Sequence, residues 1–239
     1  MSSPTKEERS ARLVIIGVGG TGCALVPLVA SLPLTSITLV DGDTIEPVNL
    51  PRQPLYGPSD VGRMKVDVAA ERLTYLSPTI PIAAMRMFID ANNIEDLVSQ
   101  HDIIADCTDD LNARKLIEAT CERHSTALVS GAVHGRQVQV MTLHADGPDA
   151  GSHTLRFFFP QKSGSEQDGC DMRAVPPSVT AFAAALMYDR VAALLNNDRS
   201  HNNMLDLIDT STGHWMRLAP PETEPQGELL ADRTAPALR

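Results

Sequence analysis

The stretch RLVIIGVGGTG, residues 12–22, constrains the fold more than any other part of the chain. Apolar residues run without interruption up to Ile16, which is typical of a strand buried on both faces. A helical pattern follows the glycines directly, so backbone N–H groups at the helix start are free to meet an anion. This stretch predicts a nucleotide-binding turn. The glycines that we assign to it are Gly17, Gly19, Gly20 and Gly22.

Short apolar runs alternate with helical periodicity as far as residue 132, and this alternation predicts a parallel sheet. The predicted strands are 12–20, 36–41, 81–89, 102–107 and 126–132. The predicted helices are 21–32, 59–76, with Ser59 or Asp60 as its cap, and 110–124. We therefore expect an α/β, Rossmann-like fold with helices on both faces of a mostly parallel sheet.

The rhythm changes after residue 133, where alternating and aromatic segments predict antiparallel strands that extend the sheet. Two such strands are expected at 136–145 and 153–159. A helix is expected at 177–195, followed by a hairpin at 204–218 that turns near Ser211–Gly213. We predict one domain over 11–218, with a nucleotide half (11–133) and a substrate-docking half (134–218). Residues 1–10 are expected to be flexible and the Pro- and Glu-rich 219–239 to be a disordered tail.

Charge and cysteine usage narrow the possible partners. The formal net charge is −10, which argues against binding nucleic acid or an anionic membrane surface. No stretch approaches the ~20 apolar residues of a membrane span, and residues 1–12 lack a secretory pattern, so we expect a cytoplasmic protein. The four cysteines, Cys23, Cys107, Cys121 and Cys170, form no C-x-x-C pair, so no zinc is expected.

The loop LVDGDTIEPVNLPRQ, residues 39–53, carries acids and an arginine between prolines directly after a strand. Asp41 at the strand end is placed to hold a ribose hydroxyl. A dehydrogenase has no use for an arginine in this loop, whereas the planar fork of Arg52 suits a triphosphate. Lys65, early in the next predicted helix, borders an apolar stripe and is expected to be neither fully exposed nor fully buried. Arg52 and Lys65 together predict a phosphate site.

The segment DCTDD, residues 106–110, lies at the carboxyl end of the fourth predicted strand, where ligands of such sheets bind. Carboxylates there, facing an arginine and a lysine, suit Mg²⁺ bridging to a phosphate. We expect Asp109 to hold the metal and Asp110 to cap the following helix, although capping by Asp109 is an open alternative.

The set GVGGTG, LVDGDTIEPVNLPRQ, VGRMK and DIIADCTDD resembles the ThiF/MoeB/HesA family, relatives of the ubiquitin-activating enzymes, over roughly residues 11–218. The resemblance implies an enzyme that binds ATP and Mg²⁺. It would adenylate the C-terminal carboxylate of a small β-grasp protein, ubiquitin-like or a sulfur carrier, that ends in Gly-Gly. Separately, the apolar content of the predicted helix 177–195 and of the C-terminal hairpin indicates that they form a homodimer contact or the docking surface. Beside the glycines, the implied site residues are Asp41 for the ribose, Asp43, Asn49, Arg52, Gln53 and Lys65 around the phosphates, and Asp109 for Mg²⁺.

The chain departs from the family pattern in three places. The two C-x-x-C pairs that hold zinc in many relatives are missing, which makes this a zinc-less variant. An R-Y-x-R-Q segment before the first strand is missing too, and only Arg9 and Arg12 precede it, so a site shared across a dimer is left open. DCTDD replaces the usual DCTDN. Cys170 lies where some relatives keep a reactive thiol, and a purely passive cysteine is the alternative.

Other functions stay open on the sequence alone. The substrate carboxylate could belong to a peptide or another small molecule rather than to a carrier protein. A non-catalytic partner subunit that binds a β-grasp protein is a second alternative. An NAD(P)-dependent oxidoreductase would explain the glycines and Asp41, but it would leave Arg52, Lys65 and Asp109 without a role.

Overall fold

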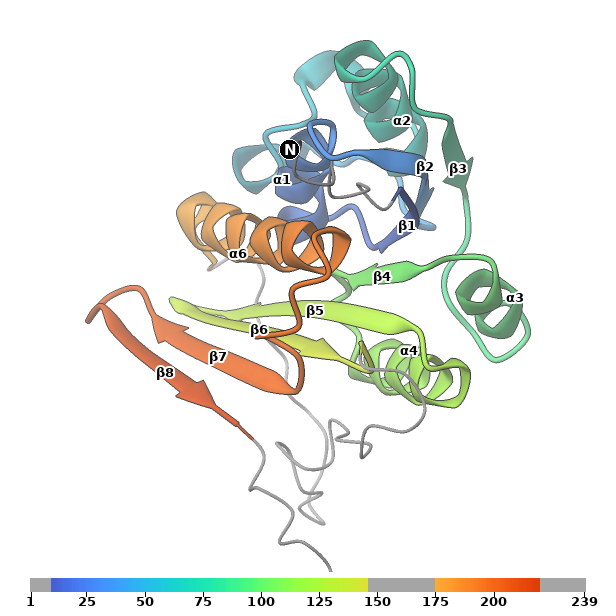
Figure 1. Cartoon of the computed structure of the whole chain (residues 1–239). Coiled ribbons are helices and arrows are strands. Elements are labelled where there is room, and N and C mark those ends of the chain that lie inside the picture. Colours follow the sequence, from blue (N-terminus) through green and yellow to red (C-terminus); the bar gives the residue numbers. More distant parts are fainter. Residues whose placement is uncertain (1–9, 146–174, 220–239) are drawn as a thin grey trace, which may run out of the picture.

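The computed structural model describes residues 10–145 and 175–219, which form one eight-stranded sheet of order β3-β2-β1-β4-β5-β6-β7-β8 (Figure 1). Pairing is parallel from β3 to β5 and antiparallel from β5 to β8, as the sequence patterns predict. The strands are β1 (Ala11–Ile16), β2 (Leu34–Val40), β3 (Ile82–Met85), β4 (Ile103–Asp106), β5 (Ala127–His134), β6 (Gln137–Leu143), β7 (Met204–Asp209) and β8 (His214–Leu218).

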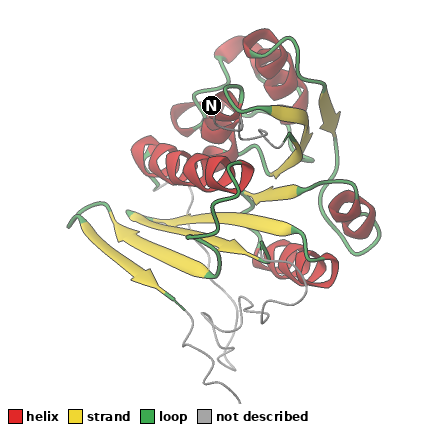
Figure 2. Ribbon diagram, viewed as in Figure 1, coloured by secondary structure: helices red, strands yellow, loops and turns green. Residues whose placement is uncertain are grey.

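Helices cover both faces of the sheet (Figure 2). The described α-helices are α1 (Gly20–Val29), α2 (Lys65–Leu76), α3 (Ile94–Ser99), α4 (Leu111–His124) and α6 (Pro177–Leu195). One apolar cluster joins α1, α2 and α6 to the sheet, and a second joins α3 and α4 to the other face. Strands β1 and β4 contribute to both clusters, which is why their sequences are apolar at nearly every position.

The second predicted helix begins later than the sequence pattern indicated, at Lys65 rather than at residue 59. A short 3₁₀ turn (Pro58–Asp60) and Gly62, whose φ is +86°, separate it from the preceding loop. The predicted capping of this helix by Ser59 or Asp60 was therefore wrong. The Asp60 carboxylate instead accepts a hydrogen bond from the backbone N–H of Gly57 and pairs with Arg72 on α2.

Helix α3 was not predicted, because its six residues are too short to show a helical period. The predicted strand at 153–159 and the thiol of Cys170 lie outside the described residues, as do most of both predicted terminal segments.

Helix α6 has the length and composition of a membrane span, with 19 residues and a mean hydropathy of 1.4, contrary to the expectation that no segment does. Within the fold it packs on α1 and on β5 and β6. Ten of its residues are buried there, so its apolar character is that of a core helix.

Candidate active site

The glycine turn between β1 and α1 requires glycine at two positions. Gly17 has a φ of +85°, a region that side chains rarely adopt, and its N–H donates to the carbonyl of Val40 at 2.8 Å. A Cβ on Gly22 would lie 1.9 Å from the carbonyl oxygen of Gly17. The turn is therefore so tight that position 22 has no room for a side chain. It brings the start of α1 to the carboxyl ends of the parallel strands.

Asp41 follows β2 and is held against this turn. Its Oδ2 accepts from the N–H of Val18 and its Oδ1 from the N–H of Asp43, both at 2.8 Å. Burial raises the pKa of the Asp41 carboxyl, while the positive charge of Lys65 and the two N–H donors oppose that rise. Each carboxylate oxygen has a second lone pair, so this side chain can still accept hydrogen bonds from ribose hydroxyls.

Lys65 is the first residue of α2, and its Nζ lies 2.8 Å from Oδ2 of Asp43. The lysine is 5% exposed, so it is more buried than the sequence suggested, while the Asp43 side chain is 54% exposed. A charge in this position needs a partner. Asp43 supplies that partner, and it keeps the ammonium next to Asp41 and the glycine turn.

Arg52, Asn49 and Gln53 come from the 3₁₀ segment η1 (Pro47–Arg52) and the residue after it. The half-buried guanidinium of Arg52 donates to the carbonyl of Val48 at 2.9 Å, which leaves other N–H groups available. Gln53 donates to Oδ1 of Asn49 at 3.1 Å, but its own Oε1 is buried and accepts no hydrogen bond from the described residues. A Cβ on Gly19 would lie 3.8 Å from Nε2 of Gln53, so this amide lies beside the glycine turn.

The three acids of residues 106–110 have different surroundings. Asp106 is fully buried and is hydrogen-bonded by Thr108 and Ser130. Asp110 caps α4 by accepting from the N–H groups of Asn112 and Ala113, which confirms its predicted role. Asp109 is exposed and forms no ion pair or hydrogen bond with any described residue. Of the three, Asp109 is the carboxylate that is available to a ligand.

The cysteines of the described ranges are not placed for chemistry. Cys23 and Cys121 are buried, and Cys107 packs its sulfur 3.8 Å from that of Met187. Burial raises the pKa of Cys23 to about 12, and burial raises the pKa of Cys107 and Cys121 as well, which keeps all three thiols protonated.

No group of three or more metal-ligating side chains occurs within residues 10–145 and 175–219. A single free carboxylate is still compatible with Mg²⁺, because Mg²⁺ is commonly held by one or two carboxylates together with the phosphates of a substrate. Asp109 would be the protein ligand.

Phe88 is a candidate site residue that the sequence reading missed. Its side chain is 66% exposed, yet its ring covers Gly42, where a Cβ would lie 2.5 Å from Cε2. An exposed aromatic ring thus lies beside the residue that follows Asp41. The contact joins residues from two strand ends, and no pattern in the sequence marks it.

Together, these features define a Rossmann-like domain whose glycine turn is bordered by Asp41, by the backbone of Arg52 and by the segment that leads to Asp109. The sequence pattern of the ThiF family matches residues 4–229, and the chain belongs to that family.

The molybdopterin-synthase adenylyltransferase of Escherichia coli (strain K12) is 36% identical over 132 residues, which are 55% of this chain and 53% of the relative. The sulfur carrier protein ThiS adenylyltransferase of the same organism is 28% identical over 209 residues, which are 87% and 82% of the two chains. The chain spans about half the length of the molybdopterin-synthase adenylyltransferases that it matches.

Solved structures of similar fold include Escherichia coli MccB, with a TM-score of 0.75 and 20% identity over 96% of this chain and 67% of that one. PaaA aligns with a TM-score of 0.70 and 18% identity over 90% of this chain and 65% of that one. At these identities the likeness shows the fold alone.

Proposed function

We propose that this chain is an ATP-dependent adenylyltransferase that uses Mg²⁺. It converts the C-terminal carboxylate of a small ubiquitin-like or sulfur-carrier protein with a Gly-Gly tail into an acyl-adenylate. Relatives named as adenylyltransferases of ThiS and of molybdopterin synthase support the reaction type and the substrate class.

The observation that carries the proposal is a chain of contacts around the glycine turn. Lys65 bonds Asp43, the N–H of Asp43 bonds Asp41, and Asp41 holds the N–H of Val18 within the turn. On the other side, a Cβ at Gly17 would lie 3.0 Å from the carbonyl oxygen of Cys107, two residues before Asp109. The groups that we propose to bind ribose, phosphate and metal therefore lie on segments that adjoin one piece of backbone.

The roles follow from the chemistry of the groups. A carboxylate oxygen of the substrate attacks the α-phosphorus of ATP, and the bond to pyrophosphate breaks with its electron pair on pyrophosphate. The nucleophile is already ionised at neutral pH, so no general base is needed. Asp41 orients the ribose, while Arg52 and Lys65 neutralise phosphate oxygens. Mg²⁺, when bound at Asp109, would supply charge for the leaving pyrophosphate.

ATP–pyrophosphate exchange with Gly-Gly-tailed proteins tests the function. We expect exchange in the wild type and a loss of about 10- to 100-fold in Arg52→Ala and in Asp109→Ala, because each substitution removes a charged contact to phosphate or metal. Lys65 is a poorer target, since its removal would also leave Asp43 without its partner.

Arg123→Ala is the matched control. Arg123 lies in the last turn of α4 and pairs at the surface with Glu95. Exchange should be unchanged in this variant. Equal losses in all three variants would contradict the assigned site.

Phe88 is proposed to stack on the adenine. Base–aromatic stacking contributes about 1–3 kcal/mol, so Phe88→Ala should raise the KM for ATP roughly tenfold and leave kcat nearly unchanged. Tyr75→Ala, which removes another exposed aromatic ring, serves as the control in the same exchange assay. A fall in kcat at unchanged KM would contradict stacking.

The exchange experiment also separates the alternative functions. Exchange with short peptides but not with carrier proteins would support a peptide carboxylate as substrate. Nucleotide binding without exchange would indicate a non-catalytic partner subunit. Reduction of NAD⁺ or NADP⁺ would support an oxidoreductase.

Homodimer formation is part of the proposal. Helix α6 is mostly buried, so the hairpin of β7 and β8 is the more available surface, and β8 exposes Trp215, Met216 and Leu218. A monomer at all concentrations in sedimentation equilibrium would contradict the dimer.

Thiol transfer by Cys170 and a cytoplasmic location are also proposals. A thioester-linked carrier that persists in Cys170→Ser would exclude that thiol.

A further inference from the structure

Arg114 is a buried arginine on α4 that the proposed reaction does not use. Its side chain donates to three acceptors on two segments: to Oγ of Ser130 and the carbonyl of Gly131 on β5, each at 3.1 Å, and to the carbonyl of Thr108. Its Nε lies 3.4 Å from Oδ2 of Asp106. One guanidinium therefore connects the end of β4 and the middle of β5 to the loop that carries Asp109.

Asp106 completes this cluster, and it cannot serve as a metal ligand. Its Oδ1 accepts from the N–H and the hydroxyl of Thr108, at 3.0 Å and 2.7 Å. Its Oδ2 accepts from the hydroxyl of Ser130 at 2.7 Å and faces Arg114. The carboxylate is fully buried, so its charge needs the arginine beside it. Oδ1 is therefore committed to Thr108, and Oδ2 to Ser130 and Arg114.

The held residue directly precedes Asp109. Thr108 is anchored on its N–H and hydroxyl by Asp106 and on its carbonyl by Arg114. The preceding residue, Cys107, is tied to β1 by a hydrogen bond from its N–H to the carbonyl of Ile16 at 2.8 Å. Asp110 is anchored in turn as the cap of α4. Asp109 is thus an unpartnered side chain on a backbone that is anchored on both sides.

We propose that Arg114 is a positioning residue that presents Asp109 to the metal of the bound nucleotide, an inference that rests on the proposed function. Arg114 does not touch the nucleotide. It fixes the carbonyl before Asp109 relative to β5, and it neutralises a carboxylate that would otherwise repel the phosphates.

Only an arginine can perform both tasks. A lysine at position 114 could neutralise Asp106, but its single ammonium could not reach Ser130, Gly131 and Thr108 together. Arg114→Lys therefore separates charge from geometry, because the folded state keeps its ion pair while the loop loses its anchor.

The test uses the full chain. Nucleotide fluorescence measures how ATP binding depends on the Mg²⁺ concentration. We expect Arg114→Lys to raise the Mg²⁺ concentration for half-maximal binding about tenfold, to leave metal-free ATP binding nearly unchanged, and to unfold within a few degrees of the wild type. Asp109→Asn should produce a similar shift, and adding it to Arg114→Lys should produce no further shift.

Arg123→Lys is the matched control, since Arg123 lies on the same helix but pairs at the surface with Glu95. An unchanged Mg²⁺ dependence in folded Arg114→Lys would overturn the proposal, as would fully additive shifts in the double variant. If Arg114→Lys does not fold, the charge-balanced pair Asp106→Asn with Arg114→Gln replaces it, with the same expected shift. This test measures ATP binding without a protein substrate. Its outcome therefore does not depend on whether pyrophosphate exchange is observed.

Discussion

Gly22→Ala should weaken nucleotide binding strongly, although alanine is the better helix former by about 1 kcal/mol. The methyl group would lie 1.9 Å from the carbonyl oxygen of Gly17 and 3.4 Å from Cβ of Cys107. The atom it strikes is backbone, so the turn itself must move. Overpacking of this kind costs about 1–3 kcal/mol or more in the free energy of unfolding. A shift of about 1 Å in the cradle is enough to lower ATP affinity by roughly a hundredfold.

The measurement is ATP titration together with urea unfolding. Gly57→Ala is the control, because φ at Gly57 is −121° and the nearest atom to a Cβ there is an oxygen of Asp60 at 3.7 Å. That variant should change the free energy of unfolding by no more than about 0.5 kcal/mol. If Gly22→Ala binds ATP as tightly as Gly57→Ala does, the turn is not the nucleotide cradle.

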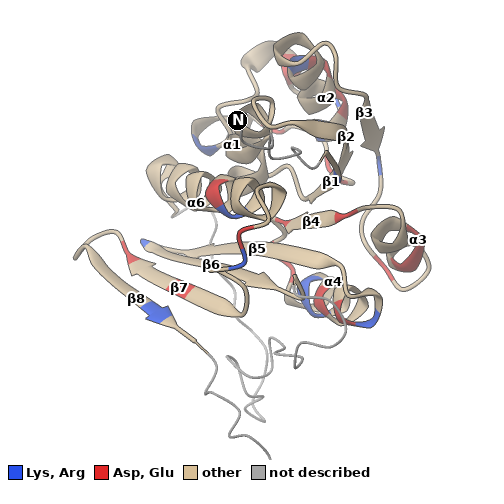
Figure 3. Cartoon of the chain, in the orientation of Figure 1, with Lys and Arg blue, Asp and Glu red and all other residues tan. Residues whose placement is uncertain are grey.

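Asp206→Asn should cost about 3–5 kcal/mol of stability, because it leaves buried positive charge without compensation. Asp206 on β7 is fully buried and pairs with Arg190 on α6 and with Arg217 on β8, while Trp215 donates to it at 2.8 Å. Figure 3 shows the acidic and basic positions on the neighbouring strands β7 and β8.

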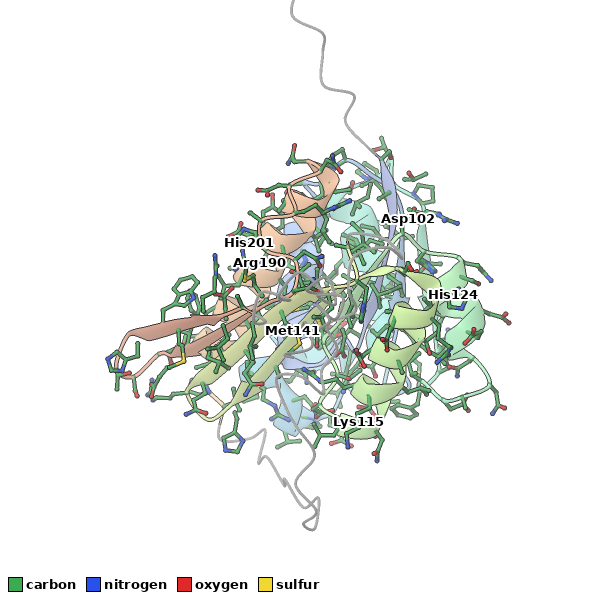
Figure 4. The ribbon with its side chains drawn as sticks, turned by 60° about the horizontal axis from the view of Figure 1, so that its bottom comes forward. Asp102, Lys115, His124, Met141, Arg190 and His201 are labelled. Atoms are coloured by element: carbon green, nitrogen blue, oxygen red, sulfur yellow. The ribbon has the colours of Figure 1, made fainter. Side chains whose placement is uncertain are left out.

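His201 lies near Arg190 of this cluster (Figure 4). Burial, together with the charges of Arg190 and Arg217, lowers the pKa of that histidine.

The pH dependence of this effect has a definite sign. Burial alone would raise the pKa of Asp206, but hydrogen bonds from Arg217, Trp215 and Arg190 hold that pKa below its usual value. A carboxyl with a lowered folded-state pKa stabilises the fold above its unfolded pKa of about 3.9, and it loses that contribution as the pH falls through the folded pKa. The stability difference between wild type and Asp206→Asn should therefore be constant from about pH 7 to 5 and shrink below about pH 4.

Urea unfolding of both proteins across this range is the check. Asp102→Asn is the control, since Asp102 and Arg12 form a surface pair in which both side chains are 46% exposed. Its loss should cost no more than about 1 kcal/mol. A cost as small as this in Asp206→Asn would show that the buried cluster does not stabilise the hairpin.

Elements with a long, regular pattern could be predicted from the sequence. The helix expected at 177–195 spans Pro177–Leu195, and the one expected at 110–124 spans Leu111–His124. The switch from parallel to antiparallel pairing was also legible, because strands buried on both faces are apolar throughout and half-exposed strands alternate. The start of α2 was not, since Asp60 bonds Gly57 and Arg72 instead of capping the helix.

The sequence by itself determined the order of strands and helices and the glycine turn, because both depend on local periodicity and on the backbone freedom of glycine. It did not determine which acid of residues 106–110 is free. That was decided by the tertiary structure, where Arg114, Ser130 and Thr108 engage Asp106 and leave Asp109 open. The burial of Lys65 against Asp43 was decided in the same way. A buried charge takes its partner from whichever elements the fold brings within hydrogen-bonding distance, and that distance is not encoded in sequence separation.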